Sequence, residues 1–85
     1  MMQPNASPDY ESRLRKILAD ADWAALREFA RSENHIPDEV YAKDEHFWRV
    51  LLHKLICNRI DQLHLHAASR AWLDQNGYST DLGGF

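Results

Sequence analysis

The sequence predicts an all-α fold: a small compact bundle of four main helices with a short extra helical turn near residues 37–42. Apolar residues recur at helical spacing along most of the chain, and residues that favour helix starts precede these segments. No stretch of alternating Val, Ile or Thr indicates a strand. With 85 residues, 45% hydrophobic and 27% charged, the chain is expected to form one globular domain over residues 1–85.

The first two helices are predicted to form a tight hairpin. Ser7 and Pro8 are typical of a helix start, and an apolar stripe follows, consisting of Tyr10, Leu14, Ile17, Leu18 and Ala21. Asp22 is placed to cap a second helix, which ends near Asn34 and has a buried edge of Trp23, Leu26, Phe29 and Ala30. Because residues 20–22 are so short a connection, the two helices should be antiparallel or sharply angled neighbours.

The third main helix is predicted to be the central one. After the short turn that begins with Pro37, Asp44 is placed to cap it. Its main apolar stripe consists of Phe47, Trp48, Leu51, Leu52 and Leu55. Four further residues spread apolar character around the rest of the circumference, namely Val50, Ile56, Cys57 and Ile60. A helix that is apolar on most sides is expected to lie in the middle of a fold.

The fourth main helix is predicted to follow a break at residues 58–61. A helix running straight on would turn its apolar face by about 100° before it reached the next stripe of Leu65, Ala68 and Trp72. Asp61 is therefore expected to cap a separate helix that stops at residues 76–77, with Tyr78 folding back on Leu73 in a Schellman motif. Residues 1–6 and 79–85 are expected to be flexible tails.

Composition and charge limit the function classes. The net charge of −3 lacks the basic surplus that usually accompanies nucleic-acid binding. The longest apolar run has three residues, Val50 to Leu52, so we expect no membrane span. A single cysteine, Cys57, excludes an intramolecular disulfide framework, and because the first residues do not have the pattern of a secretory signal, we expect no export. These features together predict a cytoplasmic protein.

The chemically active side chains form no specific motif. His53 and Cys57 are four residues apart on the predicted third helix, a spacing at which two side chains can share a metal ion, but this is half a site. Hydrogen-bonded or surface histidines and a packed thiol are the simpler interpretation. No phosphate loop, HExxH, GxSxG or paired CxxC occurs. We therefore assign no catalytic, metal or cofactor residue and expect a protein that is not an enzyme.

The aromatic content and the apolar third helix predict a partner. Three Trp, three Tyr and three Phe are many for so short a chain. Although the core should take most of them, we expect some apolar surface to be covered by another protein or by a second copy. The residues off the main stripe of the third helix, Val50, Ile56 and Ile60, are expected to be exposed and are the predicted partner-binding residues. The predicted function is a small non-catalytic interaction module, such as a regulator or adaptor.

Nucleic-acid binding is the alternative function. The short connection between the third and fourth helices resembles the layout of a helix-turn-helix, in which the second helix enters a groove. Four side chains of the fourth helix would then face the nucleic acid: Gln62, His66, Ser69 and Arg70. Against this, the helix contains one arginine and no lysine. The competing interpretation is that these four residues are its solvated side.

Overall fold

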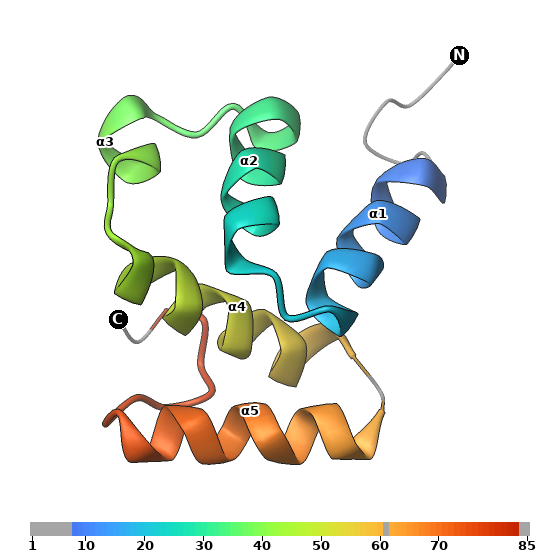
Figure 1. The fold of residues 1–85 in the computed structure, drawn as a ribbon, viewed down its shortest axis with the longest axis vertical. Helices are drawn as coiled ribbons and strands as arrows, with labels where there is room; N and C mark the ends of the chain where they lie inside the picture. Colours follow the sequence, from blue (N-terminus) through green and yellow to red (C-terminus); the bar gives the residue numbers. More distant parts are fainter. Residues whose placement is uncertain (1–7, 61, 84–85) are drawn as a thin grey trace.

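Residues 8–60 and 62–83 are described by a computed structural model, shown in Figure 1. This part of the chain contains five helices and no strand: α1 (Pro8–Ala19), α2 (Trp23–Asn34), α3 (Asp38–Tyr41), α4 (Glu45–Arg59) and α5 (Leu63–Gln75). Four are long and α3 is a single short turn, so the predicted all-α architecture is confirmed. None of these helices has the length and apolar character needed to span a membrane.

The helix α4 lies in the middle of the molecule. Figure 1 shows α1 and α2 on one side of it, while α5 runs antiparallel along the other side. The core cluster joins α1, α2 and α4 through Leu14, Leu18, Leu26, Phe29, Trp48, Leu52, Ile56 and Ile60. The prediction of a central third main helix is therefore confirmed, because this helix is covered on two sides.

The capping residues define most helix ends as predicted. The Asp22 carboxylate accepts a hydrogen bond from the Ala25 N–H at 3.1 Å, and Asp44 accepts one from the Phe47 N–H at 3.1 Å. At the end of α5 the Tyr78 N–H donates to the Leu73 carbonyl at 2.9 Å, with Gly77 at φ +81°. This is the expected Schellman motif.

Two helix ends in the structure, the end of α1 and the start of α5, differ from the prediction. Helix α1 ends at Ala19, because Ala21 adopts a left-handed conformation at φ 52° and lies exposed in the turn. The predicted cap Asp61 lies outside the described residues. The N-cap position of α5 is occupied by Gln62, which makes no side-chain cap hydrogen bond.

The expectation that Val50, Ile56 and Ile60 are exposed is wrong. Their side chains are only 1%, 2% and 7% exposed. The physical reason is that α4 packs against the α1–α2 pair on one side and against α5 on the other, so apolar residues around its circumference are covered. The apolar character that suggested a partner is used within the chain.

The segment of residues 79–83, which we call the C-terminal strap, lies against α4 (Figure 1). The Lys54 ammonium, 0% exposed, donates to the Ser79 carbonyl at 2.8 Å and to the Asp81 carbonyl. The Asn58 side-chain amide donates to the Thr80 carbonyl at 2.9 Å. These hydrogen bonds place the backbone of Ser79, Thr80 and Asp81 beside α4, and the flexibility expected of residues 79–83 stays a prediction. The other residues of the predicted tails, 1–6 and 84–85, lie outside the described part of the chain.

Candidate functional site

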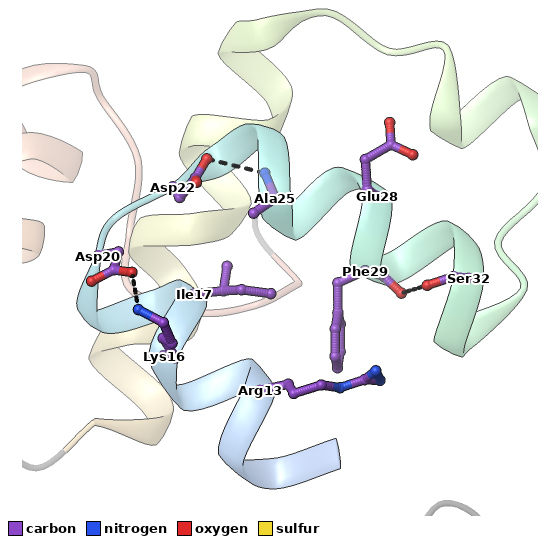
Figure 2. A pocket seen from close by; sticks show the side chains of 9 residues that line it. All are labelled: Arg13, Lys16, Ile17, Asp20, Asp22, Ala25, Glu28, Phe29 and Ser32. Carbon is purple, nitrogen blue, oxygen red and sulfur yellow. Dashed lines mark hydrogen bonds and ion pairs between the residues drawn. The ribbon is translucent and has the colours of Figure 1, made fainter. Parts of the chain in front are cut away.

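An open cleft of about 540 Å³ separates α1 from α2. The two helices diverge from the tight turn at residues 20–22, as Figure 1 shows. Nine side chains line the cleft and are drawn in Figure 2: Arg13, Lys16, Ile17, Asp20, Asp22, Ala25, Glu28, Phe29 and Ser32. Pockets of functional size usually measure 300–1,000 Å³, so the cleft is large enough to receive a side chain or a helix edge of a partner.

The floor of the cleft is apolar. It is formed by Ile17 on α1 and by Ala25 and Phe29 on α2. The Phe29 ring is fixed from two sides: the Tyr10 ring lies 5.0 Å from it between centroids, and the Arg13 guanidinium lies 5.3 Å from its centroid. Stable packing holds the floor in one shape, as a preformed binding surface requires.

The rim of the cleft is charged, and its charges differ between the two helices. On the α1 edge stand two cations, Arg13 and Lys16, while Glu28 lies on the α2 edge. Two aspartates, Asp20 and Asp22, lie at the closed end beside the turn (Figure 2). The α1 edge is thus basic, whereas the α2 edge and the closed end are acidic.

These rim charges have partners within the chain. Arg13 bridges the two helices through an ion pair with Glu33 at 2.6 Å, and Lys16 pairs with Asp20 at 3.0 Å. The Tyr41 hydroxyl donates to the Glu28 carboxylate at 2.5 Å. Exposed ion pairs are worth only about 0–1 kcal/mol, so these groups can exchange partners at little cost.

A second, smaller pocket lies on the core side of Phe29. It measures about 240 Å³ and is mostly apolar, with walls from α1, α2, α4 and the segment around Ile36 and Val40. Trp48 lines it, and the indole N–H of Trp48 is buried without a hydrogen-bond partner among the described residues. At the α1 side of this pocket the Tyr10 hydroxyl donates a hydrogen bond to the side-chain oxygen Oδ1 of Asn34 at 3.0 Å.

His53 and Cys57 are engaged separately and do not form a pair. His53 Nδ1 lies 2.8 Å from the Ser69 hydroxyl, and its ring stacks on Trp72 with centroids 4.5 Å apart. Burial lowers the pKa of His53, and the nearby Arg49 charge lowers it further. The histidine is therefore biased toward its neutral form.

The thiol of Cys57 donates to the His66 carbonyl at 3.9 Å. Burial raises its pKa, against a smaller opposite effect of the Arg70 charge. A thiol of this kind is biased away from the nucleophilic thiolate. Over residues 8–60 and 62–83, no three side chains of the types His, Cys, Asp and Glu come together in a way that could hold a metal ion.

The structure does not bring the other sequence-based candidates to the cleft. The predicted partner-binding residues lie in the interior and do not line this cleft, namely Val50, Ile56 and Ile60. The nucleic-acid alternative required Ser69 on the solvated side of α5, but Ser69 is 2% exposed and faces His53. Gln62 and Arg70 are exposed, and binding of nucleic acid through α5 stays a prediction.

Sequence reasoning missed the cleft although its signal is present. The cleft residues of α1 follow the helical spacing 13, 16, 17 and 20, and those of α2 follow 22, 25, 28, 29 and 32. Each set is a stripe in which polar and charged residues flank one large apolar residue, Ile17 in the first and Phe29 in the second. The stripes indicate a surface only once it is known that the two helices diverge.

The fold and the cleft define the class of this protein as a small all-α domain with an open, apolar-floored groove between its first two helices. Comparison with protein-family models, with curated proteins and with solved structures finds no match to this chain.

Proposed function

We propose that this protein is a small non-catalytic protein-interaction module that receives an amphipathic helix in the α1–α2 cleft. The observation that carries this proposal is the combination of an apolar floor of Ile17, Ala25 and Phe29 with a rim of exposed charges. Helix-in-groove recognition uses this arrangement, since the apolar face of the bound helix covers the floor while its flanks meet the rim.

The chemistry of the cleft supports binding over catalysis. Its lining contains neither histidine nor cysteine. Asp22 accepts the capping hydrogen bond of α2, and Asp20 is paired with Lys16. General acid–base catalysis needs groups whose pKa values are tuned toward neutrality and that face a substrate, and His53 lies elsewhere, between α4 and α5. We propose that this module acts in the cytoplasm as a regulator or adaptor, because a single cysteine is typical of proteins from a reducing compartment.

Site-specific photo-crosslinking inside cells tests the proposal. A photoreactive phenylalanine analogue replaces Ser32, which is exposed and lines the cleft. The matched control carries the same analogue at Ser12, an exposed serine of α1 outside the described pockets. We expect a discrete protein adduct from position 32 that is absent from position 12.

The adduct must also depend on the cleft itself. Ala25→Trp in the position-32 variant fills the floor of the cleft with a bulky ring, and we expect it to remove the adduct while circular dichroism still reports the helical fold. Equal crosslinking from positions 12 and 32, or an adduct that survives Ala25→Trp, would contradict the proposed function.

A further inference from the structure

We propose that the helical partner in the α1–α2 cleft is a second copy of this chain, packed so that the α1 edge of each copy meets the α2 edge of the other. This inference rests on the proposed function, because it names the occupant of the same cleft. It is carried by the charge distribution on the two edges and by the positions of Ile17 and Phe29.

The two edges of the cleft are electrostatically complementary to each other. The α1 edge carries Arg13 and Lys16, and the α2 edge carries Glu28. In a two-fold symmetric interface residue i of one copy meets residue j of the other, and residue j meets residue i. A basic edge beside an acidic edge is therefore self-complementary: Lys16 of each copy meets Glu28 of the other, twice in one dimer.

A heterologous helix would need a special sequence to match the same rim. It would have to carry acidic residues toward α1 and basic residues toward α2 and the closed end, because the charges on the two sides are opposite. The hairpin of a second copy supplies both signs in the required order. The overall charge of −3 opposes association only weakly when it is screened by salt.

The apolar floor adds the second element of the interface. When two hairpins pack edge to edge, Ile17 and Phe29 of both copies come together in a shared four-helix arrangement. Ile17 is half-buried in the single chain and gains cover by this packing. The ion pairs Arg13–Glu33 and Lys16–Asp20 lie at exposed positions and permit exchange with the second copy.

A charge-exchange experiment with the purified full chain tests this geometry. In Lys16→Glu the two facing positions, 16 on the α1 edge and 28 on the α2 edge, are both acidic. In Glu28→Lys the same two positions are both basic. Each variant alone should dimerise about tenfold more weakly than the unmodified chain, because every dimer then holds two like-charge contacts in place of two attractive ones. An equimolar mixture of the two variants restores both opposite-charge contacts and should form a heterodimer of the original strength.

Analytical ultracentrifugation at about 0.15 M ionic strength, where the net charge is screened, measures these dissociation constants, and native mass spectrometry separates homodimers from the heterodimer. Arg15→Glu is the matched control, since Arg15 is exposed on α1 and does not line this cleft. It should leave dimerisation unchanged. Because Glu28→Lys also removes the acceptor of the Tyr41 hydroxyl, Tyr41→Phe, which removes this hydrogen bond but keeps the Glu28 charge, is the second control and should also leave dimerisation unchanged.

Restored association in the mixture, with weak association of each variant alone, supports the second-copy geometry. An unmodified chain with a dissociation constant weaker than about 1 mM overturns it, as does a mixture no stronger than its components. The proposed function fails on a different result, the absence of any cleft-dependent adduct from position 32. A cleft-dependent adduct to a different protein supports the function and overturns the second-copy proposal.

Discussion

The His53 ring stacks on the indole of Trp72, with ring centroids 4.5 Å apart and ring planes inclined by 27°, and its Nδ1 lies 2.8 Å from the Ser69 hydroxyl. This arrangement joins α4 to α5 through a titratable group that burial biases toward its neutral form. We therefore expect the stability of the α4–α5 contact to depend on pH.

Protonation of His53 should destabilise the fold. Burial and Arg49 lower the pKa of His53 below the ordinary value of 6.5, so between the two values the unfolded chain binds a proton more readily than the folded chain. The contribution of His53 is then complete above pH 6.5 and is lost as the pH falls toward the folded-state pKa. Urea unfolding at about pH 7.5 and at about pH 5.5 measures this loss.

The matched variant for this prediction is His53→Gln, which keeps a hydrogen-bonding group near Ser69 and does not titrate. It should show a smaller fall in unfolding free energy between the two pH values than the unmodified chain does. Identical pH profiles of the two proteins would show that His53 is not the group responsible.

Lys54→Met should release the C-terminal strap without unfolding the domain. Methionine retains the apolar stem, while the ammonium that donates to the carbonyls of Ser79 and Asp81 is removed. Because replacing a buried charge removes its desolvation cost, we expect the unfolding free energy to change by less than about 1 kcal/mol.

Heteronuclear ¹H–¹⁵N NOE values measure the release and should fall for residues 79–83. Lys16→Met makes the same chemical change at a largely exposed position and should leave these values unaltered. If the NOE values of the strap stay high in Lys54→Met, other contacts hold it.

Trp48→Phe should be tolerated far better than Trp48→Ala. Trp48 is 1% exposed, and its indole N–H has no partner among the described residues. An unsatisfied buried donor costs about 1–3 kcal/mol, which offsets the contacts that the smaller phenylalanine ring loses. We expect Trp48→Phe to cost about 1 kcal/mol or less and Trp48→Ala about 3–5 kcal/mol. Thermal and urea unfolding compare them, and a cost of Trp48→Phe well above about 1 kcal/mol would indicate that the N–H is satisfied in solution.

Ile56→Asp should prevent folding. Ile56 is 2% exposed and belongs to the cluster that joins α4 to α1 and α2, so an aspartate there would be an unpaired buried charge. Ile56→Val should remain folded and cost about 0.5–1.5 kcal/mol. Far-UV circular dichroism distinguishes the two. If Ile56→Asp stayed helical and lost only the binding of a partner, the interior position of Ile56 would be contradicted.

The extent to which the sequence predicts this fold is clearest at the helix ends. Asp22 and Asp44 were identified as caps, and Gly77 with Tyr78 as a helix stop, because these signals act within a few residues of the chain. The same local reasoning placed Ala68 on the buried side of α5. The structure instead exposes Ala68 and buries Ser69, since the position of α4 decides which edge of the apolar stripe is covered.

The sequence by itself determined the helices, their order and the central place of α4, because helical periodicity and capping depend on near neighbours in the chain. Tertiary structure alone decided that Val50, Ile56 and Ile60 are interior, that a buried Lys54 binds the C-terminal strap, and that α1 and α2 diverge into a cleft. These features depend on which surfaces meet across long separations in sequence, and apolar burial is non-directional, so periodicity shows that a face is covered without showing what covers it.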